Sequence, residues 1–393
     1  MSRRLTAVLL VLALGGCLGG PDKADLRGGG PLVERWRIPS PVAGWVFADP
    51  LSGLIGQGRR LASVDTGPGR LRWVHDLPPG FTVTASSVSV AGNAVLVRGT
   101  GRFRVLDRTE GTVLWEREFT GQVAAEEEGD AVVTADCDRR GCDLTGWELR
   151  NGQRRWSRHV GDRVRLVSGE QPCYCLFLLG RRTVVQIGTE AGRIGWTMRK
   201  PAGVTGLIAG HDRQVLWTPP AEPDCVATLR GITGGTVDWT RDVTTDCGLP
   251  MPSTSDDPGY GVLELPVRDG LATLNLDDGQ GRTIPLDEHE RLVGGGPSRI
   301  TWTAEVGYRS IDDPQRTPAR VPPPAGGRPW AQSHRVGMWL LRSGPGLVLY
   351  DPLSGAVRWR GPEPVLIPDH DRLVYLDGPD LVGIGPRDGA VKA

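Results

Sequence analysis

The sequence predicts an all-β protein, a single β-propeller of four-stranded antiparallel blades. Three observations predict this fold: a Gly–Trp spacing recurs along the chain, short apolar runs fill each interval, and no ten-residue stretch has a helical period. Tryptophan is also unusually abundant, with 13 Trp against 5 Phe and 5 Tyr. Repeated antiparallel units arranged radially leave only short protected edges, so a propeller is the architecture that this pattern favours.

The repeat unit is an apolar strand, a polar turn with glycine, and a tryptophan four residues after that glycine. It ends at Trp73, Trp115, Trp156, Trp196, Trp239 and Trp359, and the first five follow one another at steps of 42, 41, 40 and 43 residues. A tight hairpin needs a residue with positive φ, which glycine adopts at little cost. The tryptophan can then lie over a hairpin and bury a large flat surface between neighbouring blades.

The two ends of the chain are predicted to close the ring together. Residues 381–391 begin the repeat once more, and LVERWRI (32–38) supplies a strand with Trp36 in the docking role. We therefore expect the first strand to complete the last blade. Two units are irregular: Pro285 stands where a tryptophan is due, and Arg299–Val321 lacks the Gly–Trp spacing.

Residues 1–16 are predicted to form a lipoprotein signal peptide. Arg3 and Arg4 precede the apolar run from Leu5 to Leu14, which is shorter than the ~20 residues of a stable membrane span. Leu14-Gly15-Gly16-Cys17 resembles the bacterial lipobox, which implies that Cys17 becomes a lipidated N-terminus. The alternative is an ordinary signal peptide with a chance cysteine. Residues 17–31 are then a lipidated cysteine and flexible tether, and residues 32–393 the propeller.

The other six cysteines, an even number in an exported chain, indicate three disulfides with fifteen possible connectivities. They are Cys137, Cys142, Cys173, Cys175, Cys225 and Cys247. Cys137 and Cys142 flank DRRG at facing strand ends, and Cys225 and Cys247 fall on one rim of an up-and-down blade. Cys173 and Cys175 either form a strained, labile bridge across one residue, with a redox role as a hypothesis, or pair with Cys137 and Cys142.

Charge and motif content argue against several functional classes. Lys and Arg total 46, as do Asp and Glu, and this balance argues against a nucleic-acid binder. The six histidines show no metal-ligand spacing, and the sequence has no GxSxG elbow. Asp277-Asp278-Gly279 falls where other units have a hairpin turn, which we favour over a Ca²⁺ loop. The acidic run Glu126–Glu128 is interpreted as a solvated loop.

The strand–turn–Gly-x-x-x-Trp unit resembles the tryptophan-docking motif of the quinoprotein alcohol dehydrogenase-like propellers, called PQQ-like repeats. The resemblance covers residues 32–393 and implies a propeller whose family precedent favours eight blades, with residues 286–359 as one elaborated blade. Counting every candidate unit gives nine blades, and seven also remains open. Catalytic members hold their quinone over a disulfide between adjacent cysteines, whereas this chain offers only Cys173-Tyr174-Cys175. The lipobox and single propeller make the chain more similar to the non-catalytic, BamB-like lipoproteins.

The expected function is that of a membrane-anchored extracytoplasmic lipoprotein, with no catalytic, cofactor-binding or metal residue assigned. Its propeller is expected to act as a protein-interaction or ligand-binding scaffold in the cell envelope, because propellers present wide rims of loops. The expected partner is an envelope protein or peptide. The alternative is an extracytoplasmic PQQ-dependent or other quinoprotein-like dehydrogenase.

Overall fold

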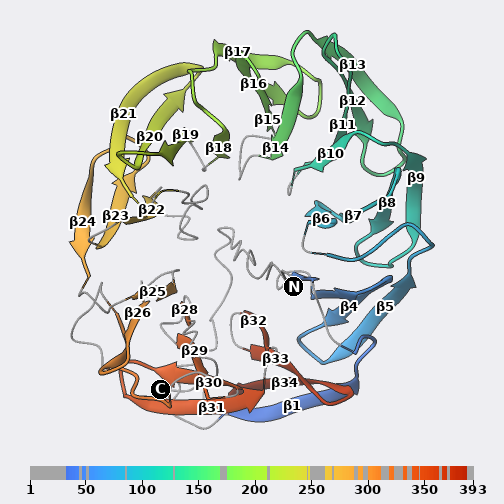
Figure 1. The fold of residues 1–393 in the computed structure, drawn as a ribbon. Coiled ribbons are helices and arrows are strands. Elements are labelled where there is room, and N and C mark those ends of the chain that lie inside the picture. The colour runs from blue at the N-terminus through green and yellow to red at the C-terminus, as the bar shows by residue number, and fades with distance from the viewer. Residues whose placement is uncertain are drawn as a thin grey trace, which may run out of the picture.

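The computed structural model describes most of the chain from residue 32 to residue 386. It leaves out 1–31, 44–46, 50–52, 85, 127–128, 169–174, 210–212, 246, 248–261, 268–269, 287–290, 295–299, 311–317, 323–330, 334–338, 345, 363–364, 370–371 and 387–393. The described residues form strands and turns, and the sheets stand in a ring around a central axis (Figure 1). None of these residues belongs to a helix that could span a membrane. The predicted all-β propeller is confirmed.

The first five sheets in chain order each have four strands. They are β2 (Phe47–Asp49), β3 (Leu54–Gln57), β4 (Arg60–Asp65) and β5 (Arg70–Asp76); β6 (Val88–Ala91), β7 (Ala94–Gly99), β8 (Arg102–Asp107) and β9 (Val113–Glu118); β10 (Gln122–Ala125), β11 (Ala131–Cys137), β12 (Cys142–Glu148) and β13 (Arg154–Val160); β14 (Val164–Ser168), β15 (Cys175–Gly180), β16 (Thr183–Gly188) and β17 (Ile194–Arg199); and β18 (Gly206–Ala209), β19 (Gln214–Ala221), β20 (Val226–Thr233) and β21 (Thr236–Thr244).

The remaining sheets include two of three strands, followed by two of four. They are β22 (Val262–Val267), β23 (Gly270–Asn275) and β24 (Gly281–Pro285); β25 (Arg291–Gly294), β26 (Ile300–Thr303) and β27 (Gly307–Ser310); β28 (Ala331–Ser333), β29 (Trp339–Ser343), β30 (Gly346–Asp351) and β31 (Ala356–Pro362); and β32 (Val365–Asp369), β33 (Arg372–Asp377), β34 (Asp380–Pro386) and β1 (Leu32–Pro39).

Nine sheets are therefore present among the described residues, and the preferred count of eight blades is corrected. Residues 286–359 do not make one elaborated blade, because β25–β27 and β28–β31 are separate sheets. Ala319 forms an isolated antiparallel bridge with Tyr308 of β27, so the weak unit keeps a remnant of a fourth strand. This unit lacks the Gly–Trp spacing, so the repeat pattern gave no clear signal for it. Its middle strands nevertheless contain buried residues, like those of the other sheets.

Burial falls from the middle of each sheet to its outer strand, as in the sheet β6–β9. The second strand β7 is buried at four successive positions, whereas the fourth strand β9, on the outer circumference in Figure 1, has no buried residue. The buried side chains join neighbouring sheets: one cluster unites Val133 and Leu144 with Leu176 and Ile187 of the next sheet. The hydrophobic core is thus a ring of sheet-to-sheet interfaces.

At most of the interfaces, a tryptophan from an outer strand lies on the hairpin of the next sheet. A Cβ on Gly152 would lie 2.7 Å from Cδ2 of Trp115, and one on Gly192 would lie 2.5 Å from Cδ2 of Trp156. Both glycines have a positive φ, 68° at Gly152 and 61° at Gly192. Glycine adopts such angles at little cost, whereas other residues do not. The ring nitrogen of Trp156 also donates a hydrogen bond to the Thr189 carbonyl, at 2.8 Å.

The same contact recurs around the ring. Trp36, Trp73 and Trp239 lie against Gly69, Gly111 and Gly279, and donate hydrogen bonds to the carbonyls of Thr66, Arg108 and Leu276. Trp196 lies more loosely on Gly235: a Cβ added to Gly235 would be 3.2 Å from the Cβ of Trp196. Trp359 packs against Tyr375 with ring centroids 5.2 Å apart, and residues 387–393, which follow β34, lie outside the described residues. Gly355 is exposed, since the unit before it lacks the docking tryptophan.

A β-bulge precedes these tryptophans in their strands. In β5, Trp73 pairs with Ser63 and Leu71 pairs with Val64, so Arg72 is the extra residue. Equivalent register shifts occur beside Trp36, Trp115, Trp156, Trp196, Trp239 and Trp359. A bulge bends its strand and redirects the next side chain. The bulge therefore turns each tryptophan toward the neighbouring sheet.

The ring closes through β1, which pairs antiparallel with β34 from Leu32 opposite Pro386 to Pro39 opposite Asp380. Arg37 of β1 forms salt bridges with Asp377 and Asp380, so side chains reinforce the same seam. The predicted closure, in which the first strand completes the last blade, is what the structure has.

Acidic side chains shape several of the docking hairpins, and Asp351 is the most buried example. Its carboxylate accepts hydrogen bonds from the Leu353 backbone N–H at 3.0 Å and the Ser354 hydroxyl at 2.6 Å, and pairs with Arg358 at 2.8 Å. Burial alone would raise the pKa of Asp351, but these donors together hold it below the ordinary aspartate value of 3.8. The folded state therefore favours the charged carboxylate.

Trp156→Ala is expected to lower the free energy of unfolding by about 3 kcal/mol, the lower end of the range for large buried aromatics, because this ring is only partly buried. Chemical denaturation measures the loss. Arg158→Ala, at an exposed position of the same strand, is the control and should change stability by less than about 0.5 kcal/mol. A loss below about 1 kcal/mol for Trp156→Ala would contradict the docking role.

Asp351→Asn is expected to cost about 2 kcal/mol at pH 7, because the charged partner of Arg358 and Ser354 is lost. The folded-state pKa of Asp351 is lowered, so its contribution is complete above the unfolded-state pKa and is lost as pH falls through the folded-state value. The stability difference between wild type and variant should thus shrink steadily below pH 3.8. Urea denaturation at a series of pH values tests this, and a constant difference would count against it.

Candidate functional site

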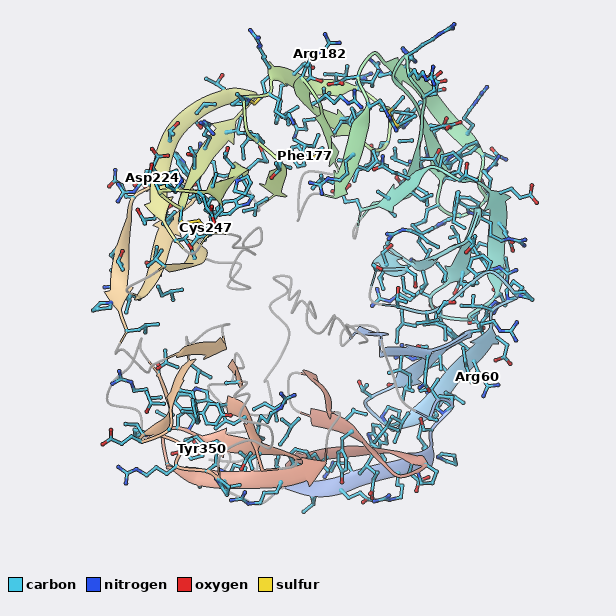
Figure 2. All side chains as sticks on the ribbon, in the orientation of Figure 1. Arg60, Phe177, Arg182, Asp224, Cys247 and Tyr350 are labelled. Carbon is cyan, nitrogen blue, oxygen red and sulfur yellow. A yellow bond between two sulfur atoms is a disulfide. The ribbon has the colours of Figure 1, made fainter. Side chains whose placement is uncertain are left out.

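The propeller has two rims that the strand directions distinguish. The docking rim carries the first-to-second-strand and third-to-fourth-strand hairpins, including 149–153 with Gly152. The opposite rim, here called the disulfide rim, carries the second-to-third-strand hairpins and the connections to the next sheet, including 138–141 and 161–163. Figure 2 shows the described side chains around the ring of sheets. Exposed loops held by a rigid scaffold are where binding residues usually lie.

One disulfide fixes a hairpin of the disulfide rim. Cys137 at the end of β11 bonds to Cys142 at the start of β12, with Cα atoms 4.0 Å apart. The hairpin between them is also held by the backbone, because the Asp138 N–H donates to the Gly141 carbonyl at 2.9 Å. Val164 of the next sheet donates its N–H to the Cys142 sulfur at 3.2 Å. The covalent link therefore stiffens a hairpin that also contacts its neighbour.

A second disulfide closes the same rim on the sheet β18–β21. Cys225 precedes β20 and bonds to Cys247, which follows β21, with Cα atoms 4.8 Å apart. Figure 2 labels Cys247 and Asp224 on this sheet, next to the sheet that bears Arg182. The Thr245 N–H donates to the Cys225 carbonyl at 3.0 Å, so the backbone joins these two segments as well. Both disulfides predicted by strand position are confirmed.

Cys175 at the start of β15 is also disulfide-bonded, at the docking rim. Its pairing with Cys137 or Cys142 is excluded, because those two cysteines bond to each other. Cys173 lies outside the described residues, as does the lipidation candidate Cys17. The redox hypothesis for Cys173 and Cys175 therefore stays a hypothesis.

Asp162 links two loops of the disulfide rim. Its Oδ2 atom accepts hydrogen bonds from the backbone N–H groups of Arg182 at 2.8 Å and Thr183 at 3.3 Å, and from the Thr183 hydroxyl at 3.2 Å. Burial alone would raise the pKa of Asp162, but these hydrogen bonds, with one from Arg181, hold it below its ordinary value. A charged Asp162 thus ties the connection 161–163 to the hairpin 181–182.

The docking rim differs from the expectation at Glu126. The acidic run 126–128 was expected to be a solvated loop, yet Glu126 is 1% exposed. Its Oε2 atom accepts a hydrogen bond from the Thr189 hydroxyl at 3.3 Å, and Thr189 is the residue whose carbonyl binds Trp156. The side chain is buried because it supports the docking hairpin of the next sheet. Glu127 and Glu128 lie outside the described residues.

The segment Asp277-Asp278-Gly279 forms the hairpin turn that was favoured over a Ca²⁺ loop. The Asp277 N–H donates to the Asn275 side chain at 2.7 Å, and the Gly279 N–H to the Asn275 carbonyl at 2.9 Å. Trp239 covers Gly279. Within the described part of the chain, no group of three or more His, Cys, Asp or Glu residues is placed to hold a metal ion.

Two described histidines each lie within hydrogen-bonding distance of a charged side chain. His159 Nδ1 lies 2.8 Å from Asp143 on the adjacent strand, at an exposed position. His75 Nε2 lies 3.0 Å from Arg104, and its pKa is lowered first by burial and then by that guanidinium. Arg104 is itself paired with Glu116. Both contacts join outer strands and belong to the scaffold.

Comparison with known proteins finds one matching family model and several solved structures of similar fold. Residues 30–216 match a family model described as "Outer membrane protein assembly factor BamB". The dihydro-heme d1 dehydrogenase NirN, solved in complex with DHE, superposes with a TM-score of 0.50 and 13% identity over 88% of this chain and 81% of that one. The matched residues make up just under half of the chain, and the likeness to NirN is one of fold: both chains are β-propellers. No curated protein matches.

Two further solved structures are similar over most of this chain. BamB from Moraxella catarrhalis has a TM-score of 0.45 and 11% identity, covering 91% of this chain and 99% of that one. The quinohemoprotein alcohol dehydrogenase ADHIIG from Pseudomonas putida HK5 has a TM-score of 0.41 and 11% identity, covering 92% and 77%.

Sequence reasoning missed the polar residues that join loops of adjacent sheets. Besides Glu126 and Asp162, Gln122 of β10 donates to the Val164 carbonyl at 2.8 Å and accepts from the Leu166 N–H at 2.9 Å. Its side-chain amide therefore extends the pairing from one inner strand to the next. These residues have no fixed place in the repeat, so the periodicity that revealed the tryptophans carries no signal for them.

The disulfides of the disulfide rim are expected to stabilise the fold unequally. Replacing Cys137 and Cys142 by Ser should cost about 2 kcal/mol, and replacing Cys225 and Cys247 about 3 kcal/mol, because the second bond closes a longer loop. Urea denaturation of the oxidised double variants measures both, with each serving as the control for the other. The reverse order would contradict the loop-entropy explanation.

Proposed function

We propose that this chain is a lipid-anchored, non-catalytic scaffold of the cell envelope that binds another protein through the loops of its disulfide rim. The observation that carries the proposal is the stiffness of that rim. One of its hairpins is closed by a disulfide, a second is bonded by another disulfide to the segment after β21, and Asp162 joins a third to the adjacent connection. A rigid surface loses little conformational entropy on binding, which favours recognition of a partner.

The side chains that connect neighbouring sheets support a structural role for the rest of the molecule. The docking tryptophans, Glu126 and Gln122 each hold one sheet to the next. The family model that matches residues 30–216 is described as an outer membrane protein assembly factor. This description extends to the present chain as part of the proposal.

The position of β1 supports an orientation for the anchored protein. Leu32 begins β1 opposite Pro386, at the docking-rim end of β34. A tether formed by residues 18–31 would therefore leave from the docking rim and span about 20 Å as a flexible chain. With lipid on Cys17, the docking rim would lie nearer the membrane and the disulfide rim would face away from it.

Cys17→Ser is expected to abolish labelling by a fatty-acid analogue and to move most of the protein from the membrane fraction to the soluble extracytoplasmic fraction, because stable anchoring needs acyl chains. Metabolic labelling and fractionation of cells carrying the full chain measure both effects. The control, Cys225→Ser with Cys247→Ser, should keep the label. Persistent labelling of Cys17→Ser would refute lipidation at this residue.

Crosslinking in intact membranes followed by affinity purification is expected to recover a defined extracytoplasmic protein with the wild-type chain. The docking-destabilised Trp156→Ala variant provides a control for recovery that depends on the native fold. Absorbance of a bound quinone in the purified protein, together with quinone-dependent oxidation of an alcohol, would instead favour the dehydrogenase alternative. Recovery of no partner from membranes that retain the anchored protein would refute the scaffold role.

A further inference from the structure

Five exposed arginines gather on the disulfide rim, where the sheets β10–β13 and β14–β17 meet. They belong to three neighbouring loops, 138–141, 161–163 and 181–182, which together contain two Asp. The five, named here the arginine surface, are Arg139, Arg140, Arg163, Arg181 and Arg182. With five Arg and two Asp the loops carry a formal charge of +3, although the whole chain has no net charge.

The three loops are in contact and form one surface. A Cβ on Gly141 would lie 3.0 Å from the Cα of Gly161, which places the hairpin 138–141 against the connection 161–163. Asp162 of that connection accepts the hydrogen bond from the Arg182 N–H at 2.8 Å, which brings in the hairpin 181–182. The Cys137–Cys142 disulfide closes the base of the first hairpin.

The acidic residues of these loops bind backbone groups. Asp138 Oδ1 accepts hydrogen bonds from the N–H groups of Arg140 at 2.6 Å and Gly141 at 3.2 Å, and Asp162 Oδ2 accepts those of Arg182 and Thr183. Among the described residues, the guanidinium groups of the arginine surface form no salt bridge. The carboxylates thus fix the loops, and the guanidinium groups face solvent.

We propose that the arginine surface binds an acidic segment, rich in Asp and Glu, of an envelope protein. A guanidinium group binds a carboxylate through two parallel hydrogen bonds, and closely spaced arginines suit successive carboxylates. This inference rests on the proposed function for the orientation of the protein. Because the tether would leave from the docking rim, the arginine surface would face away from the anchoring membrane, and a protein segment is favoured over lipid headgroups.

The next sheet limits the length of this surface. The corresponding hairpin of β18–β21 presents exposed Glu222 and Asp224, so the charge changes sign beyond Arg181 and Arg182. An acidic segment that crosses the arginine surface would be repelled there, since like charges brought close together oppose binding. The surface therefore favours a short acidic segment over a long acidic chain.

The test uses the full chain in detergent and a fluorescent ten-residue peptide of alternating Glu and Ser, with a Gln–Ser peptide for comparison. Fluorescence anisotropy at low salt should show tighter binding of the Glu peptide, and the affinity should fall as salt increases. Arg139→Gln, Arg140→Gln and Arg182→Gln, combined in one variant, should weaken binding about tenfold.

The matched control is a second triple variant in which three exposed arginines on the docking-rim side of the same sheets become Gln. They are Arg150, Arg154 and Arg193. This variant removes the same charge and should change the affinity by less than about twofold. Equal weakening by both triples would overturn the assignment, because it would show a bulk effect of net charge. Circular dichroism verifies that both triples remain folded.

Two further measurements separate this proposal from its alternatives. Vesicles of phosphatidylcholine with phosphatidylglycerol should not compete with the Glu peptide, and binding of vesicles in preference to the peptide would overturn the acidic-segment assignment. In the membrane crosslinking experiment, loss of the partner from the arginine triple alone supports the inference. Recovery of the partner by that triple overturns the inference and leaves the scaffold role intact. Peptide binding without any recovered partner supports the arginine surface and refutes the scaffold role.

Discussion

The docking of a tryptophan ring onto a glycine hairpin of the next sheet is the contact on which the ring depends. The hairpin needs a glycine at this point for two independent reasons. The residue has a positive φ, and the tryptophan side chain occupies the space that a Cβ would fill. The tryptophan must in turn come after a bulge, which directs it out of its own sheet. Four features of the sequence, the turn, the glycine, the spacing and the tryptophan, thus serve a single interface.

Because the tryptophan contacts hold the sheets together, the loops of the disulfide rim are available for binding. Because the sheet interfaces hold the ring together, residues such as Arg139 and Arg182 have no part in the core. The carboxylates of Asp138 and Asp162 nevertheless keep their loops in one conformation. Stability and display are therefore supplied by different residues, so charge on the rim can vary with little effect on the fold.

The sequence predicted those parts of the structure that repeat, and missed those that do not. Fixed spacing from Gly111 to Trp115 identified the hairpin, and strand position alone identified two disulfides. The eight-blade count was wrong because the unit around Tyr308 keeps its buried strands without the Gly–Trp signal. Glu126 was misread because its burial depends on Thr189, a residue of another sheet. Nor does sequence reveal that loops 138–141 and 181–182 are neighbours, since Asp162 joins them in space.

The outer circumference is protected from pairing with other strands, and this restricts where a partner can bind. Each fourth strand is an edge, and the residue two places before the tryptophan is an exposed aliphatic side chain at Leu71, Val113, Ile194, Val237 and Val357. Such edges invite association with other strands. The bulge beside each tryptophan interrupts the regular row of donors and acceptors, and Arg72 and Arg358 stand at the bulged positions. The bulge therefore disfavours pairing of another β-strand with each outer strand that carries a docking tryptophan. A partner protein is more easily bound by the loops of a rim.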